Sequence, residues 1–198
     1  ESAVTLARQM GDRNLEADSL TALGRACEQL SDYAQAHRCY EQALNLYRQL
    51  GNQAGEAHNL WDLGVIATVT NKKDQAGPYL KAALNLYRDL GDRTGEANVL
   101  NMLGQTTSDY AQQRAYYEQA LTIFQDLGQR ERQASLYNNL GLVYWRLGLY
   151  SQACGYGEQA VKIARHMQMS FALSMYLDSL GRAFLGLGAV DRAQQVFE

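Results

Sequence analysis

The segment ALNLYRQLG, residues 43–51, returns forty residues later as ALNLYRDLG, residues 83–91. Its apolar and small residues stand three or four positions apart, which is the spacing of one face of a helix. The closing glycine suits the left-handed residue that ends many helices, and the Asn or Asp after it can cap the next helix. The segment therefore predicts an amphipathic helix and the turn that leads into the following one.

Two dipeptide markers extend this repeat along the whole chain. Leu-Gly pairs recur at spacings of 40, 40, 37 and 40 residues, at Leu23-Gly24, Leu63-Gly64, Leu103-Gly104, Leu140-Gly141 and Leu180-Gly181. A second series keeps the same spacings, at Met10-Gly11, Leu50-Gly51, Leu90-Gly91, Leu127-Gly128 and Met167-Gln168. A fixed period of this length indicates a stacked repeat protein in which each unit packs against its neighbours.

Each repeat reads as two helices joined by a short polar turn, so we predict an all-α chain. The boundaries that follow are a second helix of a preceding repeat at 1–11, four full repeats at 12–51, 52–91, 92–128 and 129–168, and an incomplete fifth repeat at 169–198. The third repeat lacks three residues just before Ser108. The only proline, Pro78, falls four residues after Asp74, a candidate N-cap, so we expect it near the helix start, where proline costs little.

Glycines 24, 64, 104, 141 and 181 fall in the middle of the first helix of each repeat. Glycine there costs roughly 0.5–1 kcal/mol relative to alanine, so its recurrence needs a cause. We expect a close approach of the two helices of a repeat, with the small residues Ala43, Ala83, Ala120 and Ala160 on the facing helix.

The pattern resembles the tetratricopeptide repeat family. The matching features are the Leu-Gly pair of the first helix, the alanines at 36, 76, 153 and 193, and the large side chains Tyr40, Leu80 and Tyr117 of the second helix. The 40-residue period is similar to that of the long repeats in cell-polarity scaffolds, kinesin light chains and bacterial regulatory proteins. The resemblance implies a right-handed α-solenoid of stacked antiparallel helix pairs, in which the first helices line a concave groove.

The same resemblance indicates which residues line that groove, because the family presents its ligand contacts on the face of the first helix that is out of phase with the core. The predicted peptide-binding groove residues are Arg25, His58, Trp61, Asn98, Asn101, Gln105, Asn138, Trp145, Asp178 and Arg182. Amide side chains can bond both groups of a peptide backbone, and tryptophans are frequent hot spots. The family's clamp for acidic chaperone tails uses lysines, and no lysine occupies this face.

The sequence offers no sign of catalysis, and we expect no enzyme, metal site or cofactor. His37, His58 and His166 are far apart in the repeat frame, and no phosphate loop or nucleophile motif is present. The formal net charge of −3 gives no electrostatic reason to expect nucleic acid or a membrane surface as a partner. Cys27, Cys39 and Cys154 are scattered, which suits reduced thiols in semi-buried helix positions and a cytoplasmic location.

We therefore predict a non-enzymatic scaffold that binds a peptide or helical segment of another protein. The alternative is a regulatory module of a larger protein that senses a ligand or signal peptide. A self-assembling spacer is a third possibility, because the chain starts and stops inside a repeat and the apolar residues there could drive self-association.

Overall fold

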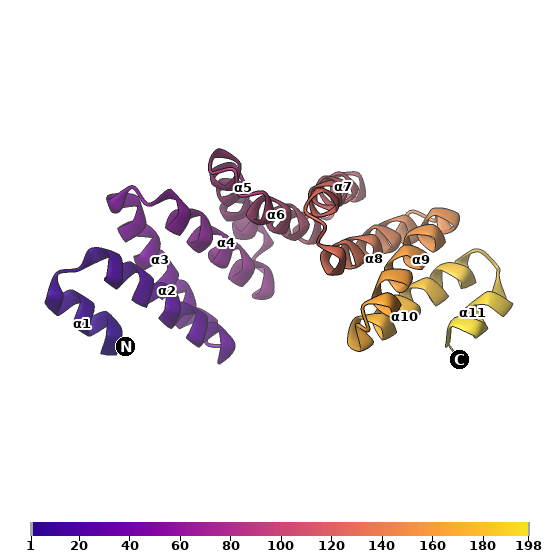
Figure 1. Ribbon diagram of the computed structural model, residues 1–198, viewed down its shortest axis with the longest axis horizontal. Coiled ribbons are helices and arrows are strands. Elements are labelled where there is room, and N and C mark those ends of the chain that lie inside the picture. The colour runs from indigo at the N-terminus through magenta and orange to yellow at the C-terminus, as the bar shows by residue number, and fades with distance from the viewer. Residues whose placement is uncertain (1, 198) are drawn as a thin grey trace. The chain divides into compact units, whose positions relative to one another are not determined.

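The computed structural model describes residues 2–197, and within them the chain forms helices joined by short turns (Figure 1). The helices are α1 (Ser2–Met10), α2 (Arg13–Gln29), α3 (Tyr33–Leu50), α4 (Gln53–Val69), α5 (Lys73–Asp89), α6 (Arg93–Thr106), α7 (Tyr110–Asp126), α8 (Arg130–Arg146), α9 (Tyr150–His166), α10 (Ser170–Gly186) and α11 (Val190–Phe197). No strand occurs in this described part, so the all-α prediction is confirmed.

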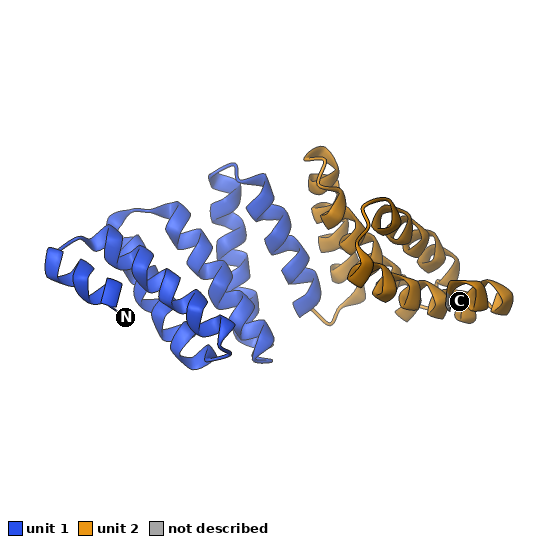
Figure 2. Ribbon diagram, turned by 60° about the horizontal axis from the view of Figure 1, so that its bottom comes forward, with its two compact units in different colours: residues 1–106 blue, residues 107–198 orange. Residues whose placement is uncertain are grey.

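The chain divides into two compact units, residues 1–106 and 107–198 (Figure 2). In unit 1 each helix from α1 to α6 packs on the next along the chain, and in unit 2 the same holds from α7 to α11. We call the even-numbered helices, which begin each predicted repeat, A helices, and the odd-numbered ones B helices. Each unit is thus a stack of alternating A and B helices, and the core of each unit lies between its own helices.

The turns from B helices to A helices follow from their glycines and caps. Gly11, Gly51, Gly91 and Gly128 all have φ between 66° and 71°, a left-handed conformation that glycine adopts without strain. The residue after glycine then caps the next helix in three of these turns: the carboxylate of Asp12, the amide oxygen of Asn52 and the carboxylate of Asp92 accept backbone N–H groups at 2.8–3.0 Å. The capping predicted from the sequence is confirmed at these turns.

The glycines in the middle of A helices do mark a close approach, but their predicted partners were wrong. A Cβ atom on Gly24 would lie 2.6 Å from the Tyr40 ring, and one on Gly64 would lie 2.6 Å from the Leu80 side chain. The large residues of the B helix therefore fill the space over these two glycines. Ala43 and Ala83 are fully buried, but they are not what a side chain at these glycines would meet.

The pair α8–α9 approaches differently. Gly157 stands where other B helices carry Tyr40 or Leu80, and a Cβ on Gly141 would meet backbone atoms of α9 at 3.4 and 3.6 Å. Leu180 of α10 packs against Gly157 instead, 3.0 Å from where its Cβ would lie. The helix α9 stays continuous through Gly155 and Gly157, and Tyr156 between them stacks on Tyr144 with ring centroids 5.1 Å apart.

Two departures from the regular repeat also have local explanations. The A helix of the third repeat, α6, has 14 residues where α4 and α8 have 17, which accounts for the missing three. The prediction for Pro78 was wrong, because α5 begins at Lys73 with Lys72 at its N-cap. Pro78 therefore lies inside the helix and deprives the Asp74 carbonyl of its usual N–H partner.

Gly64→Leu tests the close approach of α4 and α5. The new side chain would collide with Leu80, so we expect the free energy of unfolding to fall by about 1–3 kcal/mol through overpacking. Gly155→Ala is the matched control, because a Cβ there meets nothing within 4 Å and should raise stability by roughly 0.5–1 kcal/mol. Urea denaturation of both variants measures this, and an unchanged midpoint for Gly64→Leu contradicts the packing described.

Candidate functional site

The predicted groove residues lie on A helices in both units. In unit 1, Arg25 is on α2, His58 and Trp61 are on α4, and the three amide residues Asn98, Asn101 and Gln105 are on α6. In unit 2, Asn138 and Trp145 are on α8, and Asp178 and Arg182 are on α10.

A pocket of about 180 Å³ in unit 1 brings three of these residues together. His58, Trp61 and Asn98 line it with four others, namely Tyr87, Asp92, Thr94 and Gly95. The His58 ring meets the Tyr87 ring edge-on, with centroids 5.6 Å apart, and its Nδ1 lies 2.8 Å from the Ala54 carbonyl oxygen. The pocket therefore joins α4, the end of α5 and the first turn of α6.

Gly95 shapes this pocket by allowing Tyr87 to lie against α6. A Cβ at position 95 would stand only 2.4 Å from the tyrosine ring, so any other residue would displace the ring. Gly55 accommodates Tyr47 in the same way in the preceding repeat. Burial raises the pKa of Tyr87, with a smaller contribution from Asp92, so its hydroxyl stays protonated.

Two buried polar atoms of α4, one on a residue of the pocket and one on the residue after it, have no hydrogen-bond partner among the described residues. They are Nε1 of Trp61 and Oδ2 of Asp62. Leaving such an atom unsatisfied costs roughly 1–3 kcal/mol, so buried polar groups without partners are uncommon. Trp61 and Asp62, which are adjacent on α4, thus carry a buried donor and a buried acceptor that make no hydrogen bond within the described residues.

Asp62, which follows Trp61 on α4, is a buried carboxylate that the sequence analysis missed. Its side chain is almost fully buried, and its nearest cation is Arg25, whose Nε lies 3.8 Å from Oδ2. Burial raises the pKa of Asp62 to about 6, although Arg25 acts in the opposite direction. The signal available in the sequence was that a carboxylate stands where other repeats have Ala22, Met102 or Ser179.

A buried hydrogen-bonded network lies next to Asp62 and connects α2 with α3 and α4. Thr21 and Asn59 bond each other through side chains, with the Asn59 amide donating to the threonine oxygen at 3.1 Å. The Tyr47 hydroxyl donates to Asp18 at 2.6 Å. Asn59 also donates to the Gly55 carbonyl at 3.0 Å, so this network is satisfied internally and holds the helices that carry the site.

In unit 2 the predicted residues differ in exposure. Asn138 is buried, and its Oδ1 has no hydrogen-bond partner in the described part of the chain. Trp145 is 37% exposed near the end of α8. Asp178 and Arg182 form an exposed i,i+4 ion pair at 2.8 Å, which contributes little to stability.

Other chemistry is not apparent in the described residues. No group of three or more His, Cys, Asp or Glu side chains is placed to hold a metal ion between residues 2 and 197. Cys27, Cys39 and Cys154 are free thiols, half-buried or buried as expected from the sequence. No helix in that range combines the length and apolar character needed to span a bilayer.

Comparison with known proteins decides the family. The model of the tetratricopeptide repeat matches residues 1–49 and 105–166, which is more than half of the chain. The chain belongs to the tetratricopeptide repeat family. Its fold is accordingly the right-handed α-solenoid of antiparallel helix pairs. A comparison with curated protein sequences gives no match.

Solved structures of this repeat fold resemble the chain over most of its length. BtubC from P. vanneervenii is 22% identical with a TM-score of 0.84, covering 98% of this chain and 87% of that one. The Rap conjugation gene regulator of plasmid pLS20, in complex with the Phr* peptide, is 19% identical with a TM-score of 0.70, covering 96% and 54%. A signal transduction ATPase from Pyrococcus horikoshii with a tetratricopeptide repeat sensor is 17% identical with a TM-score of 0.84, covering 93% and 30%.

Asp62→Asn tests the electrostatics of this tetratricopeptide site. Because the folded pKa of about 6 lies above the usual 3.8, protonated Asp62 stabilises the fold fully below about pH 4. That contribution is lost as the pH rises through 6. Asparagine stays neutral, so the variant should gain stability relative to the parent between pH 4 and 7, by about 3 kcal/mol for a two-unit shift.

The measurement is the free energy of unfolding by urea at several pH values for parent and variant. Asp126→Asn, at an exposed carboxylate on α7, controls for the loss of one negative charge. A difference between parent and Asp62→Asn that stays constant from pH 4 to 7 would show that Asp62 is not a buried, destabilised carboxylate.

Proposed function

We propose that this tetratricopeptide array is a non-enzymatic scaffold whose A-helix face binds a peptide or helical segment of a partner protein. The proposal takes residues 1–198 as one array with the repeat boundaries predicted from the sequence. In each unit the candidate ligand contacts are the predicted groove residues of that unit, and in unit 1 Asp62 is added to them. Protein is the only partner class proposed, and the free thiols suit a cytoplasmic setting.

The observation that carries the proposal is the pocket beside Trp61. It combines an apolar indole, a histidine ring and the Asn98 side chain within about 180 Å³, which is enough for one side chain of a ligand. Trp61 lines it, and its Nε1 makes no hydrogen bond within the described residues; Oδ2 of Asp62, the next residue on α4, makes none either. A peptide carries both a carbonyl acceptor and N–H donors, so a small side-chain adjustment would let it satisfy both atoms.

The structural neighbours support the same class of function. The pLS20 Rap regulator shares this repeat fold and was solved with the Phr* peptide. Repeat arrays expose long surfaces of this kind, and peptides can use them as extended or helical ligands. Binding of another protein is therefore the function that best fits a chain built of such repeats.

The alternative function is sensing within a larger protein. The Pyrococcus horikoshii ATPase carries a tetratricopeptide repeat sensor, and this chain spans 30% of that protein. On this alternative the same A-helix face binds a signal peptide and transmits the event to an attached effector domain. The full-length sequence distinguishes the two, because a scaffold needs no effector.

Trp61→Ala and Asn101→Ala test the proposed groove. Residues near the centre of an interface dominate its affinity, so each change should weaken binding of the true partner by about 1–2 kcal/mol or more. Partners are recovered by pull-down from host lysate, and their affinity is then measured by calorimetric titration. Trp61→Phe separates the two roles of the indole, because it keeps the apolar ring and removes the N–H donor.

Arg48→Ala is the control, since Arg48 lies on the B helix α3 and bonds Glu56 at 2.7 Å. We expect it to leave the affinity nearly unchanged. Thermal melts of all variants show whether a loss of binding reflects unfolding. If Arg48→Ala abolishes binding while Asn101→Ala and Trp61→Ala leave it intact, the ligand uses the other face and the groove proposal is wrong.

A further inference from the structure

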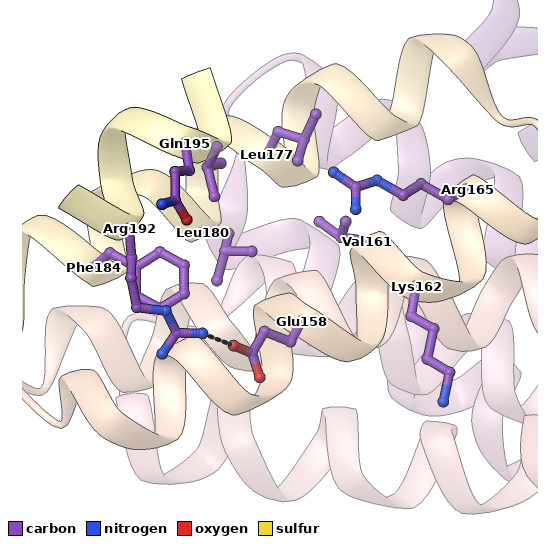
Figure 3. A pocket seen from close by; sticks show the side chains of 10 residues that line it. Glu158, Val161, Lys162, Arg165, Leu177, Leu180, Phe184, Arg192 and Gln195 are labelled. Atoms are coloured by element: carbon purple, nitrogen blue, oxygen red, sulfur yellow. Dashed lines mark hydrogen bonds and ion pairs between the residues drawn. The ribbon is translucent and has the colours of Figure 1, made fainter. Parts of the chain in front are cut away.

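A second cleft lies on the B-helix side of unit 2, between α9 and α11 and above α10 (Figure 3). Its volume is about 500 Å³. The floor is apolar and consists of Val161, Leu177, Leu180 and Phe184. None of these residues belongs to the predicted groove, so the cleft is a separate feature of the molecule.

The rim of the cleft is positively charged. Lys162 and Arg165 come from α9 and Arg192 from α11, against one carboxylate, Glu158. Three cations and one anion give a formal charge of +2, on a chain whose net charge is −3. Arg192 is already engaged, because its Nη2 bonds Glu158 at 2.7 Å and its guanidinium lies 4.2 Å from the centre of the Phe184 ring.

Arg165 lacks the glutamate partner that the equivalent arginines of other repeats have. In three other places an arginine at the end of a B helix pairs with a glutamate eight residues later: Arg8 with Glu16 at 2.7 Å, Arg48 with Glu56 at 2.7 Å, and Arg88 with Glu96 at 2.8 Å. Eight residues after Arg165 the chain has Leu173. No ion pair involves Arg165 or Lys162 among the described residues, and the Arg165 side chain extends over the cleft (Figure 3).

The equivalent cleft in unit 1 shows whether the hollow and its positive rim both recur in another repeat. It lies between α3 and α5 and has a volume of about 450 Å³. Arg48 occupies the position of Arg165 but is bound to Glu56, and Asn45 replaces Lys162. The hollow is therefore a property of the repeat and does not depend on its place in the chain, whereas the free positive charge is particular to unit 2.

We propose that the cleft formed by α9, α10 and α11 binds an acidic amphipathic segment of a partner protein. Apolar side chains of the segment lie on Val161, Leu177 and Leu180, and its carboxylates pair with Arg165 and Lys162. An apolar floor favours a ligand with its own apolar side chains, because burying both removes them from water. Unpaired cations at the rim favour carboxylates, which form charge-assisted hydrogen bonds with guanidinium.

This surface is distinct from the A-helix face, so it does not rest on the proposed groove. A scaffold with both surfaces can hold two partners at once. A nucleic acid fits the cleft less well, because a phosphate backbone has no apolar groups to place on the apolar floor.

The test uses the whole chain and an array of fluorescein-labelled 12-residue helical peptides. Each peptide carries two or three leucines and two or three glutamates, and the array as a whole covers the different spacings that these residues can have along a helix. Every peptide has a twin in which glutamine replaces glutamate. Fluorescence anisotropy should find glutamate peptides that bind at least about tenfold more tightly than their twins, with the difference shrinking as salt is raised. Arg165→Gln combined with Lys162→Gln should remove that preference.

Arg48→Gln is the matched control in the equivalent cleft and should not change the preference, nor should Trp61→Ala on the A-helix face. The proposal is overturned if no glutamate peptide binds, if twins bind equally, or if Arg48→Gln has the effect of the double variant. It is also overturned if single-stranded oligonucleotides or phosphatidylserine vesicles bind more tightly than any peptide and lose binding in the double variant. These outcomes can be interpreted even if the experiments on the A-helix groove fail, because they measure binding to a different surface.

Discussion

The fold of unit 1 depends on a size match between a glycine in an A helix and a large side chain in the B helix of the same repeat. Gly24 lies under Tyr40, and Gly64 lies under Leu80, with no room for a Cβ in either place. This match brings two helices close enough to bury Ala36 and Ala76 completely. Because the other helices of unit 1 stack on these two pairs, the positions of the pocket at Trp61 and of the cleft between α3 and α5 follow from it.

The elements set by neighbouring residues could be predicted from the sequence. The forty-residue period, the left-handed glycines and the caps at Asp12 and Asn52 are all local properties, and the structure has them. The error at Pro78 was also local, since Asp74 suits an N-cap by its chemistry but lies two residues beyond Lys72, where the helix begins. Turn chemistry therefore predicts that a helix starts more reliably than it predicts the residue at which it starts.

Properties that depend on packing between helices could not be predicted in this way. The side chains that cover Gly24 and Gly64 lie one turn from the expected alanines, because the relative height of two helices depends on all of their contacts. The burial of Asp62 depends on Arg25 and its neighbours one repeat earlier. Three of the predicted groove residues do share a pocket with Tyr87, which the sequence analysis had taken only as part of the repeat pattern. The repeat frame thus indicated the face, and the structure supplies its depth and charge.

The exchange of roles at Gly157 limits how this array could evolve by duplication. In α9 the large B-helix residue is absent, and Leu180 from the next repeat occupies the space. A copy of α3 inserted in place of α9 would bring a tyrosine into the volume that Leu180 already fills. A duplication that replaced α9 with a copy of α3 would therefore need a smaller residue at position 180, whereas Tyr40 and Leu80 of the first two repeats each pack on the A helix of their own repeat.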